Sequence, residues 1–209
     1  MMKNQIQIPK ATAKRLPLYY RFFKSLSDAD VKRVSSVEIS ENLQIDPATI
    51  RRDFSHFGAL GKKGYGYSVN YLLDYFSEVL RKDEDKRVVL IGVGHLGSAL
   101  IRHNRDGINQ HGRICMGFDV HIPEPIIAEI PIYHMDQFEE KMKAQQIEVA
   151  ILAVPQDQAQ KVANRLVRAG IRGILNFTPH RLNISNVVIH DIDLTQELQF
   201  LLYLLDHYR

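Results

Sequence analysis

The sequence is poor in cysteine and tryptophan, with one cysteine, Cys115, and no tryptophan in 209 residues. A single cysteine excludes an intrachain disulfide and a zinc site built from cysteines, and its apolar neighbours predict a buried thiol. No apolar run approaches the roughly 20 residues that cross a bilayer. The N-terminal stretch MMKNQIQIPKATAKR lacks the apolar segment of a signal peptide. We therefore expect a cytoplasmic protein without a metal site.

Charge is present in an ordinary amount but is unevenly distributed along the chain. Lys and Arg outnumber Asp and Glu by 12 to 8 in residues 1–80, whereas the two classes number 15 and 16 in residues 81–209. An excess of positive charge in one part of a chain indicates a polyanionic partner for that part. The hydrophobic content of 45% supports real cores and excludes a mainly disordered protein. The charged run RKDEDK (81–86) predicts a linker between two domains.

The N-terminal part has the signals of short helices. LPLYYRFFKSL (16–26) has helical spacing, and Ser35 with Glu38 forms an S-x-x-E capping box that opens the helix VEISENL. Asp46 and Pro47 then give an N-cap and a proline at the first position of the helix PATIRRDFSHFGAL. Two helices joined by a short turn predict a helix-turn-helix. On the second helix, Ile50, Phe54 and Phe57 share one face, which we expect to pack in the core. Arg51, Arg52 and Ser55 point away from that face and are available to a partner.

The segment GKKGYGYSV (61–69) predicts a small β-hairpin, or wing, after the second helix. Its glycines permit tight turning, and Tyr65, Tyr67 and Val69 alternate as in a strand. A basic helix fits the major groove of double-stranded DNA, and lysines at a hairpin tip contact phosphates. The alternative is a solvated charged face. The candidate DNA-binding residues are Arg51, Arg52, Ser55, Lys62, Lys63 and Tyr65.

After the linker the pattern changes to alternating strands and helices. The strand RVVLI (87–91) leads into GVGHLG (92–97), and SALIRH continues as a helix. This is G-x-G-x-x-G between a strand and a helix, the context in which the motif indicates a dinucleotide site. Gly92 permits the tight turn, Gly94 lets a pyrophosphate approach the backbone, and Gly97 allows close packing of helix and strand. The alternative is a close-packed turn that binds no ligand.

The next strand, RICMGFDV (113–120), ends near a carboxylate. Asp119 stands where a dinucleotide-binding unit presents an acid to the adenine ribose, which favours NAD over NADP. The spacing from the glycine motif requires a loop over 103–112. Further strands and a helix at Gln156–Ala169 predict a parallel, doubly wound sheet. The strands are IPIY (130–133), EVAILAVP (148–155), IRGILNF (171–177) and VVIHDID (187–193).

The C-terminal helix LTQELQFLLYLLDHYR (194–209) is apolar almost all round, with Asp193 as a candidate N-cap. A helix of this kind must be covered on several sides, and a domain this small has little to cover it with. We therefore expect a dimerisation helix that a partner chain covers, inserted between the domains of the other subunit. The alternative is an internal core helix.

Taken together, the chain resembles the Rex family of bacterial redox-sensing transcriptional repressors over almost its whole length. The resemblance implies a homodimer of winged-helix domains joined to Rossmann domains, which binds pseudopalindromic operators and releases them when NADH replaces NAD+. It gives a DNA-binding domain over 1–82, a Rossmann domain over 83–193 and a dimerisation helix over 194–209. The motifs that carry it are ATAKRLPLYYR (11–21), SS (35–36), IRRDFSHFGALGKKGYGY (50–67), GVGHLGSAL (92–100), FDV (118–120), AILAVP (150–155), GILNFTP (173–179) and IDLTQELQFLLYLL (192–205).

The resemblance also implies roles for single residues. It places the DNA contacts in the helix-turn-helix and wing residues already named, and it assigns Asp119 to the adenosine ribose. Arg21 and Asp193 match a family pair that links the two domains. The residue at His103 closes over the nicotinamide pocket. The remaining cofactor residues are the pyrophosphate turn of Gly92, Val93, Gly94, His95, Leu96 and Gly97, and the nicotinamide neighbours Val154, Pro155, Asn176, Thr178 and Pro179.

Three departures from the family pattern define an alternative. His103 replaces the usual tyrosine, His121 replaces an acid, and the loop 121–133 is short and lacks glycine. A Rex-like regulator with a weak or lost NADH response is therefore the second hypothesis. An NAD-dependent oxidoreductase is the third, but Tyr20-x-x-x-Lys24 precedes the dinucleotide motif and His180 has no assignable partner. We expect no catalytic activity.

Overall fold

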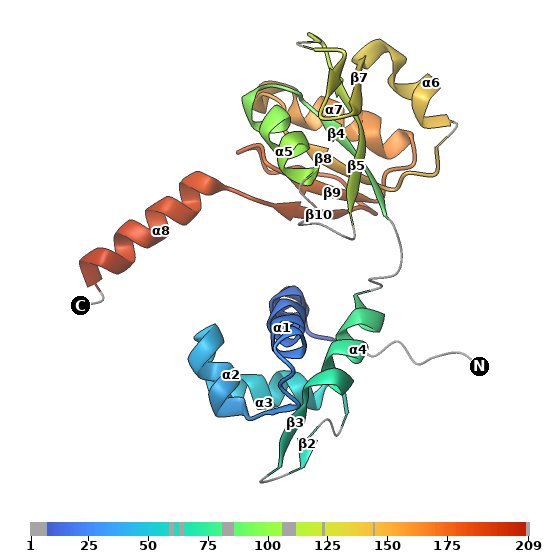
Figure 1. Cartoon of the computed structure of the whole chain (residues 1–209). Helices are drawn as coiled ribbons and strands as arrows, with labels where there is room; N and C mark the ends of the chain where they lie inside the picture. Colours follow the sequence, from blue (N-terminus) through green and yellow to red (C-terminus); the bar gives the residue numbers. More distant parts are fainter. Residues whose placement is uncertain are drawn as a thin grey trace. The chain divides into compact units, whose positions relative to one another are not determined.

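The computed structural model describes residues 8–58, 61–62, 65–80, 86–105, 112–122, 124–143 and 145–207. The chain divides into two compact units, Met1–Glu84 and Asp85–Arg209 (Figure 1). Within the described residues, no helix is long and apolar enough to cross a membrane.

The described residues of the N-terminal unit form four helices and a small antiparallel sheet, as expected for a winged helix. The sheet order is β1-β3-β2. The wing strand is shorter than expected, because Val69 begins a helix rather than continuing the strand, and that helix was not predicted. The elements are α1 (Lys10–Asp28), β1 (Arg33–Val34), α2 (Ser36–Leu43), α3 (Pro47–Ser55), β2 (Gly61–Lys62), β3 (Gly66–Ser68) and α4 (Val69–Val79).

Local capping begins the two helices of the helix-turn-helix. The Glu38 amide donates to Ser35 Oγ at 3.1 Å, and the Ser35 amide donates to Glu38 Oε2 at 2.7 Å, which confirms the capping box. Asp46 Oδ1 accepts from the amides of Ala48 and Thr49, and Pro47 occupies the first turn. α3 ends at Ser55, so the helix is shorter than the segment PATIRRDFSHFGAL expected for it.

An aromatic cluster forms the core of this unit and holds α3 in place. The Tyr19 and Phe54 rings meet edge-on with centroids 5.1 Å apart, and Phe76 of α4 stacks on Tyr19 at 6.0 Å. The predicted core face is confirmed, since Ile50 and Phe54 of α3 and Phe57 just after its end are at most 5% exposed. The largest buried side chains are Tyr19, Phe23, Phe54, Phe57 and Phe76.

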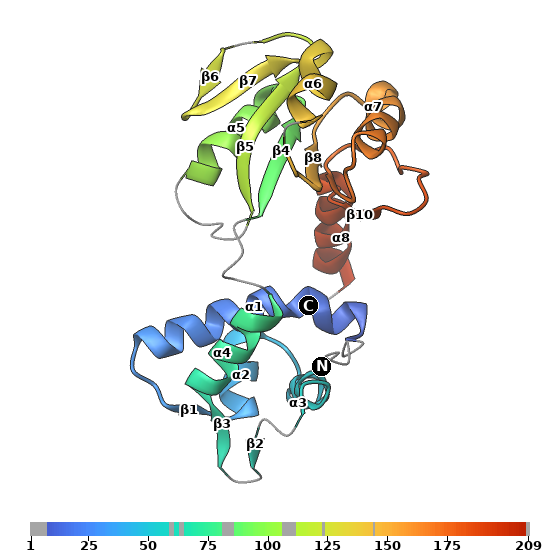
Figure 2. The ribbon, with the colours of Figure 1, turned by 90° about the vertical axis from the view of Figure 1, so that its right-hand side faces the viewer.

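The second unit contains a seven-stranded sheet of order β10-β9-β8-β4-β5-β7-β6. Figure 2 shows β8, β4, β5, β7 and β6 in this order from right to left. The pairs from β10 to β7 are parallel, whereas β6 and β7 form an antiparallel pair at one edge. The predicted parallel sheet is confirmed apart from this edge. The strands are β4 (Arg87–Ile91), β5 (Arg113–Asp119), β6 (Ile126–Ile127), β7 (Ile130–His134), β8 (Val149–Leu152), β9 (Gly173–Asn176) and β10 (Val188–Asp191).

Helices cover both faces of the sheet, so the fold is doubly wound. Leu90 of β4 packs with Ile101 of α5, while Val89 and Ile91 pack with α6 and α7 on the opposite face. This alternation along a buried strand is what two covered faces require. The helices are α5 (His95–Arg105), the 3-10 turn η1 (Met135–Gln137), α6 (Phe138–Lys143) and α7 (Gln156–Arg168). α5 extends to Arg105, so the loop expected over 103–112 begins later.

The last helix, α8 (Leu194–His207), follows β10 and extends away from the sheet (Figure 1). The amides of Thr195 and Gln196 donate to Asp193 Oδ1, which confirms the predicted N-cap. None of its residues is buried, so the alternative of an internal core helix is wrong for the single chain. The apolar residues that are at least half exposed are Leu194, Leu198, Phe200, Leu201, Leu202, Tyr203 and Leu205.

The thiol expected to be buried is in fact half-buried. Cys115 lies in β5, and its Sγ donates to the Val88 carbonyl at 3.4 Å. It is therefore a strand residue with a weak internal hydrogen bond.

Candidate nucleotide site and DNA-binding helix

The glycine motif forms the turn between β4 and α5, and its glycines serve different purposes. Gly92 has a φ of +94°, and a Cβ there would lie 2.3 Å from the Ala153 carbonyl oxygen. A Cβ on Gly97 would lie 2.0 Å from the Gly92 carbonyl oxygen. A Cβ on Gly94 would meet nothing within 4 Å. The fold therefore requires the first and third glycines, whereas the second leaves space in front of the backbone.

That space belongs to a cleft of ≈ 620 Å³ at the carboxyl ends of β4, β5 and β8. β4 is where the strand order reverses, and open α/β sheets bind ligands at this switch point. Its walls are mostly apolar, and the polar side chains among them are those of Asp119, His121 and Gln158. The lining residues are Ile91, Gly92, Gly94, Phe118, Asp119, Val120, His121, Met135, Ala153, Val154, Pro155, Gln158 and Val162.

The Asp119 carboxylate is held in place at this cleft by two backbone amides. Oδ2 accepts from the Val93 amide at 2.6 Å, and Oδ1 accepts from the His121 amide at 3.0 Å. Each carboxylate oxygen can accept more than one hydrogen bond, so both can still accept from hydroxyl groups. The contact with Val93 ties the end of β5 to the glycine turn, which brings the acid to the motif despite the long spacing.

The structure brings five of the expected cofactor residues to the cleft, and others lie beside it. Gly92, Gly94, Asp119, Val154 and Pro155 line it. Val93 is buried, Gly97 packs on the turn, and His95 and Leu96 are exposed at the start of α5.

The Asn176–Pro179 turn is not part of this cleft in the single chain. Asn176 is 0% exposed, and its Nδ2 donates to the His180 carbonyl and to Asp191 Oδ1. Its Oδ1 accepts from the amide and the hydroxyl of Thr178, which is itself buried. The polar groups of both side chains therefore hold the turn together. Pro179 is exposed.

Sequence reasoning assigned no role in binding to several residues that line the cleft. His121 lies two residues after Asp119, and Gln158 lies in the first turn of α7, just after Val154 and Pro155. The signal for Gln158 was its position, because a helix that follows a switch-point strand begins at the cleft. Within the described part of the chain, no group of three His, Cys, Asp or Glu side chains could hold a metal ion.

On α3 the expected DNA-contact residues share an exposed face. Arg51, Arg52 and Ser55 are all exposed. Arg51 Nη1 donates to Ser36 Oγ of α2 at 3.2 Å, and the Ser55 hydroxyl donates to the Arg52 carbonyl at 2.6 Å. The remaining guanidinium donors of both arginines are available to a partner.

The wing adds a basic residue that sequence reasoning missed. The Arg33 guanidinium lies over the Tyr65 ring, 5.0 Å from its centroid, and Nη1 donates to the Tyr65 carbonyl at 3.1 Å. Both side chains are exposed, Tyr65 by 68%. Lys63 and the side chain of Lys62 lie outside the described residues. Only the pairing of β1 with β3 brings Arg33 to the wing, so no local motif could reveal it.

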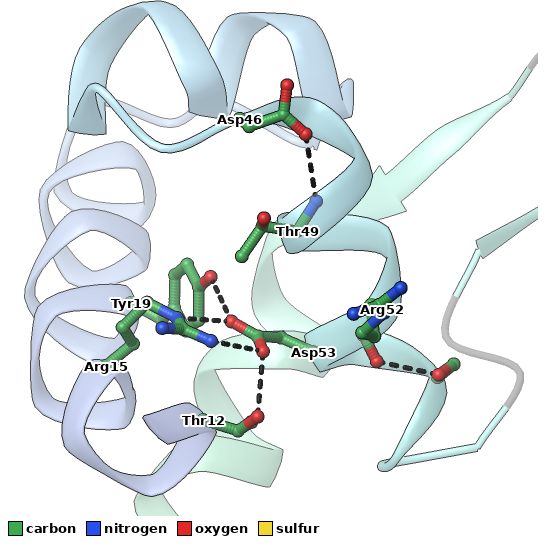
Figure 3. A network of polar contacts seen from close by, with 8 residues as sticks. Thr12, Arg15, Tyr19, Asp46, Thr49, Arg52 and Asp53 are labelled. Atoms are coloured by element: carbon green, nitrogen blue, oxygen red, sulfur yellow. Dashed lines mark hydrogen bonds and ion pairs between the residues drawn. The ribbon is translucent and has the colours of Figure 1, made fainter.

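Behind the exposed face of α3, a buried carboxylate connects this helix to α1 (Figure 3). Asp53 is 1% exposed and accepts hydrogen bonds from Thr12 Oγ1, from Arg15 Nε and Nη2, and from the Tyr19 hydroxyl, at 2.6–2.8 Å. Burial acts to raise the pKa of Asp53, but the hydrogen bonds from Arg15, Tyr19 and Thr12 outweigh it and leave the pKa below its ordinary value. The carboxylate is therefore charged at neutral pH.

The three residues expected to couple the domains lie on separate elements. Arg21 is exposed on α1, and His103 is exposed on α5. Asp193 caps α8, as described above.

Comparison with known proteins gives matches to both units and to the whole chain. Residues 7–55 match the family model "Putative DNA-binding protein N-terminus", and residues 83–180 match "CoA binding domain". A redox-sensing transcriptional repressor Rex from Exiguobacterium sp. is 54% identical over 211 residues, covering 100% of this chain and 96% of the relative. The protein of that name from Bacillus mycoides is 56% identical over 209 residues, covering 98% and 99%.

Solved structures with the same arrangement of elements are those of RSP, described as a Rex-family repressor. RSP in complex with beta-NAD+ and operator DNA gives a TM-score of 0.86 at 32% identity, covering 95% of this chain and 93% of that chain. RSP in complex with beta-NADH gives a TM-score of 0.83 at 30% identity, covering 96% of this chain and 95% of that chain.

Proposed function

The chain belongs to the Rex family of redox-sensing transcriptional repressors, and we propose that it releases its operator when NADH replaces NAD+ in the cleft. Residues 1–82 would bind double-stranded DNA, residues 83–193 would bind the dinucleotide, and residues 194–209 would join two chains. A repressor acts where the chromosome is, so we place it in the cytoplasm. The observation that carries the proposal is the open face of Gly94 beside the tethered carboxylate of Asp119.

The cleft supports a dinucleotide in one orientation. The pyrophosphate would lie against Gly94 and the start of α5, where free amides and the helix dipole favour an anion. Asp119 would accept from the adenine ribose hydroxyls, and its charge would repel the 2′-phosphate of NADPH. Val154 and Pro155, on the far wall, would face the nicotinamide. The Asn176–Pro179 turn would support that end by its shape, since its polar side chains are already bonded internally.

The N-terminal unit supports DNA binding through α3 and the wing. Arg51 and Arg52 would reach base edges in the major groove, where arginine pairs with guanine. Arg33 and Tyr65, with the lysines of the wing, would contact the backbone or the adjacent groove. We assign no catalytic role to the chain, because its relatives of 54% and 56% identity are named as transcriptional repressors.

The exposed α8 supports a homodimer. Apolar surface of this extent on a single helix marks an interface, and exchange of a terminal helix is a common way to make a symmetric dimer. A two-fold dimer would place two recognition helices in major grooves separated by about 34–36 Å, so the operator would be a pseudopalindrome.

Operator binding titrated separately with NADH and NAD+ tests this proposal. NADH should weaken operator binding, and by reciprocity operator DNA should weaken NADH binding by the same factor. NAD+ should bind the same cleft with a much smaller effect. If calorimetry finds no NADH binding at millimolar concentration while operator binding is intact, the regulator with a lost NADH response replaces this proposal.

A further inference from the structure

DNA contact leaves the buried carboxylate of Asp53 unexplained, because it lies on the side of α3 that faces away from the exposed arginines. Its three partners on α1, Thr12, Arg15 and Tyr19, are spaced by three and four residues and therefore share one face of that helix. A buried ion pair adds little net stability compared with apolar residues of similar volume. Its best-attested use is to select one arrangement among several that apolar packing permits.

Apolar packing leaves one property of α3 weakly determined, namely its rotation about its own axis. Ile50 and Phe54 bury one side of the helix, but hydrophobic contact is non-directional and tolerates a small rotation. Hydrogen bonds are directional, and the Asp53 carboxylate accepts four of them from a neighbouring helix. This network, called here the α1–α3 clamp, therefore fixes the rotation that the apolar core leaves loose.

The rotation of α3 decides what its exposed face can reach. Helical side chains extend about 5–6 Å from the axis, so a rotation of roughly 10° moves a surface atom by about 1 Å. Hydrogen-bond lengths span only about 0.5 Å, so a shift of this size breaks a paired contact to a base. Arg51 and Arg52 are the side chains that such a rotation would displace.

We propose that Asp53 is a positioning residue for operator recognition, acting through the α1–α3 clamp on the arginines of α3. This inference rests on the proposed function. Sequence preference depends on where side chains meet base edges, whereas binding to unrelated DNA depends on charge. Loss of the clamp therefore lowers the affinity for the operator and affects unrelated DNA only as far as the change in charge does.

The test uses the full-length chain without dinucleotide. Asp53→Asn removes the charge and keeps the shape, and Asp74→Asn makes the same chemical change at an exposed position of α4. Dissociation constants are measured for a duplex that the wild-type chain selects from random sequences and for a scrambled duplex of equal length. Asp53→Asn should lower the affinity for the selected duplex by roughly tenfold or more. Its affinity for the scrambled duplex should match that of Asp74→Asn, because both variants gain the same charge.

Milder variants keep the test decisive if Asp53→Asn fails to fold. Tyr19→Phe and Thr12→Val each remove one hydrogen bond to the carboxylate, and the Tyr19 ring remains packed on Phe54 and Phe76. Both should lower the preference for the selected duplex by a smaller factor. Arg15→Ala combined with Tyr19→Phe should cost less than the sum of the two single effects, because both act through one carboxylate.

The outcomes separate this inference from the function it rests on. A wild-type chain that selects no duplex overturns the proposed function and the inference together. A wild-type chain with a clear preference that the clamp variants retain overturns the inference alone. Equal losses on selected and scrambled duplexes also overturn it, since they indicate a smaller folded fraction rather than a displaced α3.

Discussion

Substitution of Gly94 should abolish the NADH response without weakening the fold. A Cβ at this position meets nothing within 4 Å, so we expect a valine side chain to fit the free protein and to project into the cleft. Replacing a glycine whose backbone is compatible with a side chain lowers the entropy of the unfolded chain, and for alanine this stabilises by about 0.4–1 kcal/mol. We expect Gly94→Val to unfold at or near the wild-type temperature.

The same substitution should greatly lower the affinity for NADH, although it leaves the stability of the fold intact. The valine methyl groups would occupy the space where a pyrophosphate approaches the backbone amides at the start of α5. A hundredfold loss of NADH affinity corresponds to about 2.7 kcal/mol, a magnitude expected when backbone contacts to a charged group are lost. The variant should therefore bind its operator normally and keep it when NADH is added.

Gly97→Ala is the matched control, because its Cβ would lie 2.0 Å from the Gly92 carbonyl oxygen. That change must move backbone, so it should lower the unfolding temperature as well as NADH affinity. Circular dichroism reports unfolding, and NADH fluorescence reports binding without interference from tryptophan, which the chain lacks. A Gly94→Val chain that still binds NADH tightly would refute the assignment of the pyrophosphate to this turn.

Four further predictions concern other parts of the chain. Removal of residues 194–209 should give a monomer or an aggregate with very weak operator binding, and sedimentation that still shows a dimer would contradict the role of α8. Arg52→Ala should cost about 1–3 kcal/mol on the operator and relax its sequence preference, whereas Arg33→Ala should weaken all sequences alike and lower the salt dependence measured by titration. Asp119→Ala should weaken NADH binding in calorimetry and bring the affinities for NADH and NADPH closer together. An unchanged ratio of these two affinities would exclude a role of Asp119 at the ribose. The hydrogen bonds from Arg165 lower the pKa of Glu139 from 4.5 to about 2, so this pair should stabilise the fold above pH 4.5 and lose that effect as the pH falls towards 2. The effect should be small because Glu139 is half exposed, and Glu139→Gln should remove it from the acid unfolding curve.

Local signals in the sequence were sufficient for much of the fold. The caps at Ser35 and Asp46 depend on residues two or three positions away, so their effect can be read from the chain directly. The glycine motif was recognisable because strand and helix flank it. α4 was missed because the glycines and tyrosines of the wing favoured a longer strand. Ser68, whose hydroxyl accepts from the Tyr71 amide, was the signal for its start.

Contacts between distant residues were beyond local reasoning. Thr12 and Asp53 are 41 positions apart, and only the packing of α1 on α3 makes them neighbours. Arg33 and Tyr65 meet through strand pairing in the same way. The end of β9 gives a third example. Asn176 ends this strand and Thr178 follows it, at the edge of the sheet where ligands bind, but both side chains are buried and their polar atoms find partners within the protein, in the turn and on β10.

The tethering of Asp119 has a consequence for what a redox sensor of this kind measures. Both of its oxygens are held by amides of Val93 and His121, so the carboxylate that we propose for the adenosine ribose is in place before any ligand arrives. NAD+ and NADH share their adenosine end, so under this proposal Asp119 would contribute equally to the binding of both. When the total concentration of NAD+ and NADH exceeds both dissociation constants, every cleft is occupied. The fraction of clefts that hold NADH then depends on the two concentrations, each divided by its dissociation constant. The protein then responds to the ratio of NADH to NAD+ concentrations, and a change that multiplies both concentrations by the same factor has no effect.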